Sequence, residues 1–235
     1  MKYIIPILII SILKLPSFAQ IGNYISSAKL KETLENEQLI YRMSQNGDSM
    51  GYTKAIYFVN NIEAGYKEEV SAIFSGKLME EQINCVYDLQ NDKFKSAESD
   101  ITYAGNTFKF KGNWLDSNKI QVKVNSLDTL LIPDEHLERT FSIFILPRLI
   151  YNKDINVRYL QFNSMDLRFR QISASVDTSE KHISTKFGVK NCSVVSLKGG
   201  VAEQDIYVDK ETSRIVRIVI PAMGWEYDLI DIRSN

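Results

Sequence analysis

The sequence predicts a mainly β protein, in which a single large antiparallel sheet curls into a half-barrel around one principal helix at about 134–146. Three observations predict this fold. Apolar and polar residues alternate after Leu39, as in FKFK (108–111), and a period of two puts one face of a strand in the core and the other in water. Turn residues separate these segments at short intervals. Only one stretch has apolar residues at helical spacing.

The first residues are typical of a secretory signal peptide. Lys2 precedes an apolar run that ends at Leu13, and Ser17 and Ala19 suit the −3 and −1 positions of a cleavage site. The run is too short for a membrane anchor, which needs about 20 residues, and no later segment approaches that length. We therefore expect residues 1–19 to be removed, the protein to be exported to the periplasm or the extracellular space, and no transmembrane span.

Length and charge narrow the class of protein further. The chain has 235 residues and a formal net charge of −1, so it has no strong field for binding nucleic acid or anionic lipid. A chain of this length forms one large all-β domain or two small ones. Because there is no linker, low-complexity stretch or repeat, we expect a polar N-terminal segment at 20–38 and a single domain at 39–235.

The first half of this domain is predicted to be a series of strands joined by short turns. The residues QNGD (45–48) indicate a hairpin, because Asn-Gly accepts the positive φ angles that a tight turn requires. The β-rich segments are 40–59, which contains this hairpin, 66–76, 82–92, 101–112 and 119–126.

One helix is predicted in the middle of the chain. Asp134 is expected to cap it, Glu135 and Glu138 to lie at the positive end of its dipole, and Pro147 to end it. The apolar positions at helical spacing are Leu137, Phe141, Phe144 and Ile145. Because these positions cover more than one face, we expect the helix to pack deep against the sheet.

The second half of the chain returns to strands. The segments are 155–163, 166–176, 181–188, 192–199, 203–209, 213–220 and 225–230. Gly199-Gly200 and DKET (209–212) are turn sequences that separate neighbouring strands.

The C-terminal order of strand IYVD, turn DKET, strand SRIVRIVIP and strand WEYDLI resembles a bacterial secreted, periplasmic half-barrel family of unknown function. It is more distantly similar to the lipoprotein carrier LolA. The hairpin YRMSQNGDSMG (41–51) and Leu146-Pro147-Arg148 are also similar to the family, whereas Ser213 replaces its usual glycine after the turn. The resemblance covers most of residues 37–230 and implies a sheet curled around one or two helices.

The chain contains no combination of residues typical of an enzyme. His136 and His182 are the only histidines, they lack the spacing of metal ligands, and we expect both at the surface or rim. There is no G-x-S-x-G elbow. The acidic neighbours Glu68-Glu69 and Glu80-Glu81 point to opposite faces of a strand, which does not suit a pair of catalytic carboxylates. We expect no catalytic residues, no metal and no cofactor.

The two cysteines, Cys85 and Cys192, lie on strands that many other strands separate. A disulfide needs Cα atoms within about 7 Å of each other, and distant strands of a meander do not meet that condition. We therefore do not expect a Cys85–Cys192 bond, although an oxidising compartment leaves it as an alternative.

Aromatic residues are the best indication of function. If the sheet curls, its concave face suits an apolar ligand; the alternative is that helix and sheet fill each other. The candidate ligand-binding residues are Phe108, Phe110, Trp114, Leu137, Phe141, Phe144, Trp225 and Tyr227. We expect an exported, non-enzymatic protein that binds an apolar or lipid-like ligand. The alternative is an envelope structural or interaction protein with a filled core and a protein partner.

Four lysines alternate with the apolar residues of two neighbouring strands. These are Lys109, Lys111, Lys119 and Lys123. We interpret them as the water-facing side of the sheet; the alternative is a resting place for an anionic headgroup.

Overall fold

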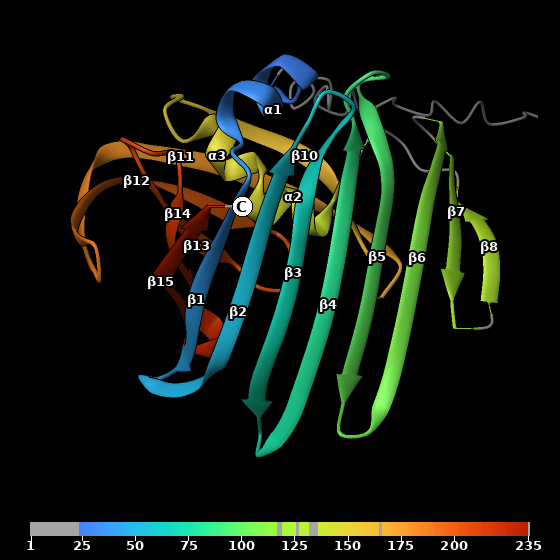
Figure 1. Ribbon diagram of the computed structural model, residues 1–235, viewed down its shortest axis with the longest axis horizontal. Coiled ribbons are helices and arrows are strands. Elements are labelled where there is room, and N and C mark those ends of the chain that lie inside the picture. The colour runs from blue at the N-terminus through green and yellow to red at the C-terminus, as the bar shows by residue number, and fades with distance from the viewer. Residues whose placement is uncertain (1–23, 117–118, 126, 132–135, 165, 235) are drawn as a thin grey trace, which may run out of the picture.

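A computed structural model describes residues 24–234, except 117–118, 126, 132–135 and 165. The expected signal peptide (1–19) and the expected cap Asp134 lie outside the described residues. The first eight strands form a meander (Figure 1). They are β1 (Glu37–Gln45), β2 (Asp48–Val59), β3 (Glu63–Phe74), β4 (Lys77–Asp88), β5 (Lys93–Tyr103), β6 (Asn106–Asp116), β7 (Lys119–Val124) and β8 (Leu127–Leu131).

The remaining strands continue the same sheet from the other side of β1. They are β9 (His136–Glu138), β10 (Asn156–Asn163), β11 (Arg168–Thr185), β12 (Gly188–Lys198), β13 (Gln204–Asp209), β14 (Ile215–Ile220) and β15 (Trp225–Ser234). The 15-stranded sheet runs from β8 through β1 to β15 and on to β9. Its neighbours are antiparallel except β9 and β10. The prediction of one large, curled, mainly antiparallel sheet is confirmed.

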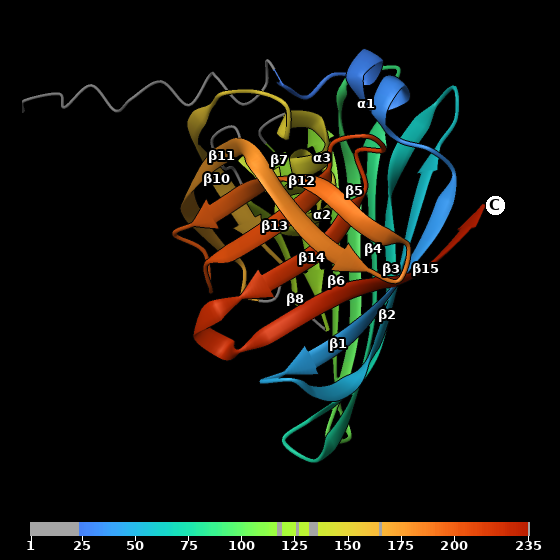
Figure 2. The same cartoon turned by 90° about the vertical axis from the view of Figure 1, so that its left-hand side faces the viewer.

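The curl brings strands together that are far apart in the sheet order (Figure 2). The rings of Phe110 on β6 and Phe162 on β10 lie 5.9 Å apart. The indole Nε1 of Trp114 on β6 donates a hydrogen bond to Nε2 of His136 on β9, with 3.1 Å between the nitrogens. The concave face is therefore an enclosed interior.

The prediction of one helix at 134–146 is wrong. Short strand β9 occupies the first described part of this range, and two short helices follow: α2 (Arg139–Phe144) and α3 (Leu146–Ile150). The Glu138 carboxylate caps α2, accepting hydrogen bonds from the backbone N–H groups of Thr140 (2.6 Å) and Phe141 (3.2 Å).

Pro147 begins the second helix and does not end the first. It lies in the first turn of α3, where the missing N–H has no helical partner to lose. The Leu146-Pro147-Arg148 segment is thus the buried start of α3.

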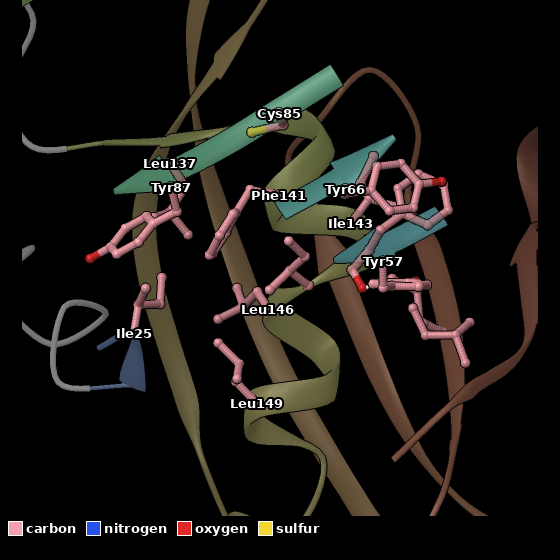
Figure 3. Packing of buried hydrophobic residues seen from close by; sticks show 14 of the residues in the cluster. Ile25, Tyr57, Tyr66, Cys85, Tyr87, Leu137, Phe141, Ile143, Leu146 and Leu149 are labelled. Atoms are coloured by element: carbon pink, nitrogen blue, oxygen red, sulfur yellow. Dashed lines mark hydrogen bonds between the residues drawn. The ribbon is translucent and has the colours of Figure 1, made fainter. Parts of the chain in front are cut away.

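Helices α2 and α3 lie inside the curled sheet (Figure 3). Phe141 is fully buried, and its ring lies 4.9 Å from that of Phe94 and 5.9 Å from that of Tyr87. Phe144 stacks on Tyr66 with 4.5 Å between ring centroids. The helices therefore fill much of the interior with aromatic packing.

The N-terminal segment is part of the same core. It contains helix α1 (Ser27–Thr33), which covers one end of the sheet (Figure 1). Leu30 and Leu34 are buried in the main hydrophobic cluster together with Ile25. Because residues 20–38 are mostly polar, the sequence pattern did not predict that these three side chains belong to the core.

Two predicted strand boundaries differ from the structure. Most of segments 166–176 and 181–188 belongs to one long strand, β11, which ends at Thr185. Its pairing with β12 is interrupted between Asp177 and Lys181, where the sequence pattern suggested a break between two strands. Segment 101–112 instead contains a turn, in which Ala104 and Gly105 have φ angles of 53° and 82°. Ser213, which follows the DKET turn, has a φ of 56°, a conformation that glycine adopts at less cost.

Candidate functional site

A pocket of about 270 Å³ remains in the concave interior. Its lining includes Phe74 at the end of β3 and Met79 near the start of β4, and Figure 1 shows that this turn lies at the opposite end of the sheet from α1. We call this space the inner pocket. Its apolar lining includes Met43, Val70, Phe74, Met79, Ile218 and Ile220, and its polar lining is Glu68, Glu81, Arg139, Thr140 and Gln204, with the indole of Trp225 and the phenol of Tyr227. A mainly apolar pocket with few polar groups is typical of a small-molecule site.

The β3–β4 hairpin brings two carboxylates into this pocket. Alternation along β3 places Glu68 on the same face as Val70. The pairing register sets Val70 opposite Glu81 on β4, and Glu68 opposite Ile83. Glu68 and Glu81 are consequently diagonal neighbours on the concave face of adjacent strands, a position from which side chains interact.

Burial is the largest influence on the pKa of both carboxyl groups, and it raises each pKa. Burial and the neighbouring charge of Glu81 raise the pKa of Glu68 to about 7, although the hydrogen bond from Thr53 Oγ1 (2.8 Å) and the charge of Arg139 oppose this. Burial also raises the pKa of Glu81, and Arg139 again opposes it. Perturbed groups in a concave site are typical of functional positions.

Three polar atoms of residues that line the inner pocket have no hydrogen-bond partner in the described part of the chain. They are Oε1 of Glu81, Oε1 of Gln204 and Nε1 of Trp225, and all three are buried. Native proteins leave few such atoms unpaired, since each loses its hydrogen bonds to water on burial. The inner pocket therefore presents two unused acceptors and one unused donor.

The sequence reasoning missed the Glu68–Glu81 pair. It considered Glu68 with Glu69 and Glu80 with Glu81, and adjacent residues do point to opposite faces. The signal that identifies the pair is the turn at Ser75-Gly76. Pairing Phe74 with Lys77 and counting outward along both strands places Val70 opposite Glu81.

The eight candidate ligand-binding residues separate into two groups. Phe144, Trp225 and Tyr227 line the inner pocket. The others do not line it: Phe110, Trp114, Leu137 and Phe141 are buried in the core, and Phe108 packs against it. Most of the eight predicted residues therefore stabilise the fold, and only Phe144, Trp225 and Tyr227 belong to the pocket.

His136 is a correction to the predicted surface or rim position. It is 5% exposed and accepts the hydrogen bond from Trp114 described above. Its ring also packs edge-on against Phe169, 5.3 Å away. The reason is that His136 belongs to β9, the strand that faces β6 across the interior, and not to a helix turn at the surface. His182 is exposed, as expected.

Cys85 and Cys192 are buried free thiols. Burial is the main cause that raises the pKa of both, to about 11 for Cys192. A thiol with a raised pKa is a poor nucleophile. Neither cysteine lines the inner pocket.

The four lysines of the outer face are exposed and paired with acids. The nitrogen–oxygen distances are 2.6 Å for Lys109–Asp100, 2.5 Å for Lys111–Glu98, 3.0 Å for Lys119–Asp116 and 3.9 Å for Lys123–Asp128. This pairing agrees with a water-facing surface and leaves little positive charge to attract an anionic headgroup.

Among the residues that the structure describes, no three His, Cys, Asp or Glu side chains are grouped so that they could hold a metal ion. No described helix combines the length and the apolar character needed to cross a membrane.

Glu68 is expected to make the protein less stable as the pH rises through neutrality. Its pKa is about 7 in the folded protein, against an ordinary value of 4.5. Between these values the folded state binds more protons, so the free energy of unfolding falls as the pH increases. We expect urea unfolding to show a loss of about 1–3 kcal/mol from this group between pH 5.5 and 8.0.

The variant Glu68→Gln tests this expectation, because it removes the titrating group and keeps its shape. The slope of stability against pH should become shallower in Glu68→Gln, with a smaller slope left from Glu81. Glu69→Gln, on the outer face of the same strand, should keep the slope of the unchanged protein. An unchanged slope in Glu68→Gln would show that this carboxyl does not titrate as stated.

Comparison with known proteins supports the fold and leaves the function open. A solved beta-barrel-like protein of domain of unknown function DUF1849, from Brucella abortus, aligns with a TM-score of 0.61 and 8% identity, covering 86% of this chain and 98% of that one. A DUF1089 family protein from Pseudomonas aeruginosa aligns with a TM-score of 0.43 and 11% identity, covering 73% and 90%; that score is too low to indicate a shared fold. No family model and no curated protein matches the sequence. The first likeness shows the fold alone, and the similarity to LolA stays a prediction.

Proposed function

We propose that this is an exported, non-enzymatic protein that holds a small, mainly apolar ligand in the inner pocket of its curled sheet. The observation that carries the proposal is the pocket itself: an interior space of about 270 Å³ with a mainly apolar lining and a few polar groups. Export is supported by the signal-peptide pattern of residues 1–19.

The pocket volume limits the size of the ligand. A cavity of about 150 Å³ in another protein accommodates benzene, so about 270 Å³ suits one substituted ring or a short chain. A two-chain lipid is too large for the space. The proposal therefore narrows the expected lipid-like ligand to a small amphiphile, or to a single short tail of a larger molecule.

Native mass spectrometry of the protein purified from its own cell envelope tests the proposal. We expect a small co-purifying mass that is absent from Val70→Trp, because Val70 lines the inner pocket and an indole would fill it. Ser71→Trp is the matched control, since Ser71 is exposed on the outer face of the same strand. A bare protein mass in all three, with no binding of added 2-phenylethanol, would contradict the proposal.

A second function has one observation in its favour. Ile73 and Leu78 are 48% and 50% exposed and lie opposite each other on the outer face of β3 and β4, and a larger exposed apolar patch is typical of a contact site for another protein. An envelope interaction protein would crosslink to a defined partner, and Leu78→Asp would abolish the crosslink while the pocket stayed empty. That pair of results would favour the second function over the first.

A further inference from the structure

The polar groups of the inner pocket have an excess of hydrogen-bond acceptors without a partner. Glu81 and Gln204 each contribute a buried oxygen without a partner, whereas Trp225 contributes one N–H. Two carboxyl groups, Glu68 and Glu81, line the space together with a single guanidinium, that of Arg139. A ligand that fits this set brings hydrogen-bond donors and a positive charge.

A third carboxylate, that of Glu138, already has hydrogen-bond partners within the protein. Glu138 accepts the backbone N–H groups of Thr140 and Phe141 at the start of α2, and it does not line the pocket. Glu68 accepts a hydrogen bond from Thr53. Glu81 is therefore the carboxyl group with an oxygen left for a ligand.

The polar groups of the inner pocket fall into two sets. Arg139, Gln204 and Trp225 line both the inner pocket and a smaller adjoining pocket of about 100 Å³. Glu68 and Glu81 line only the inner pocket, together with the apolar residues Val70, Phe74 and Met79. A ligand that reaches both Glu81 and Gln204 therefore has its polar head inside the inner pocket, with these apolar side chains beside it.

We propose that the ligand is a small apolar amine, whose protonated amino group donates hydrogen bonds to Glu81 Oε1 and Gln204 Oε1 while its ring or chain lies against Val70, Phe74 and Met79. This inference rests on the proposed function and specifies the ligand class. An ammonium group supplies three donors and no acceptor, which matches the two unused acceptors. An oxygen acceptor elsewhere on the ligand would pair with Trp225.

Three probes of nearly equal size test the charge preference: 2-phenylethylamine, 2-phenylethanol and phenylacetate. Calorimetry at pH 7.5 on the protein without residues 1–19 compares their affinities. Because charge-assisted hydrogen bonds are about twice as strong as neutral ones, we expect the amine to bind at least about tenfold more tightly than the alcohol. The anionic phenylacetate should bind least.

The variant Glu81→Gln separates the charge from the shape of the site. It should weaken binding of 2-phenylethylamine about tenfold and leave binding of 2-phenylethanol unchanged. Glu80→Gln is the matched control, because Glu80 is exposed on the opposite face of β4. Circular dichroism melting of each variant reports whether the fold is retained.

The outcomes distinguish the inference from the proposed function. If the alcohol binds as tightly as the amine, or if Glu81→Gln does not change the preference, the inference is overturned and the proposed function stands. If no probe binds and no ligand co-purifies, the proposed function fails and the inference fails with it.

Discussion

Glu37→Gln is expected to lower the free energy of unfolding by about 3–5 kcal/mol, because it removes the partner of a buried charge. The Arg148 side chain is 1% exposed, and its Nη2 atom lies 3.0 Å from Oε1 of Glu37. Nε and Nη1 of Arg148 have no hydrogen-bond partner among the described residues. The guanidinium carbon also lies 4.4 Å from the centre of the Tyr57 ring. Urea unfolding followed by tryptophan fluorescence measures the change.

A double-variant cycle gives this prediction its control. Arg148→Met should cost less than Glu37→Gln, because Glu37 then keeps its ion pair with Arg214, 2.6 Å away. The combined variant should be more stable than Glu37→Gln alone, since no unpaired charge stays buried. A combined variant that loses the sum of both single effects would contradict this account.

Phe141→Ala is expected to lower the free energy of unfolding by about 3–5 kcal/mol, as truncation of a buried aromatic side chain does. Phe141 is fully buried, and its ring lies close to that of Tyr87 (Figure 3) and to that of Phe94. The deletion would leave a cavity where α2 meets the sheet, in a region that the surrounding strands hold rigidly.

Met79→Ala is the matched control for Phe141→Ala. Met79 is half-buried and lines the inner pocket, so its truncation enlarges an existing space and should cost less than about 1.5 kcal/mol. The same two variants distinguish a core residue from a pocket residue. Met79→Ala should change the affinity for the probes, whereas Phe141→Ala should mainly lower the free energy of unfolding. Equal losses of stability would show that the inner pocket is packed as tightly as the core.

The interior of the curled sheet is filled by helices along part of its length and hollow along another part. Figure 1 shows α2 and α3 inside the sheet on the side of α1, and Phe141 and Leu146 are buried there. The inner pocket begins at α2, which contributes Arg139, Thr140, Ile143 and Phe144 to its lining, and it extends to Phe74 and Met79 near the β3–β4 turn. The packed core and the inner pocket therefore lie in different parts of the same interior.

The sequence by itself determined the class of fold and most of the strands. Alternation in segments such as 108–111 and turn residues such as Asn46-Gly47 are local properties, because they depend on which side of one strand faces water. The same locality explains the errors. The carboxylate of Glu138 and the ring of Pro147 were assigned to a single helix, and only the packing of β9 against β10 showed that the chain first extends and then forms two short helices.

The tertiary structure alone decided the site. Glu81, Gln204 and Trp225 come from β4, β13 and β15, and their proximity depends on how far a 15-stranded sheet curls. The period of a strand predicts which face a side chain occupies, but it contains no information about what lies across the interior. Likewise, Arg148 and Glu37 are both charged residues that a sequence reading places in water, and the curl buries them against each other.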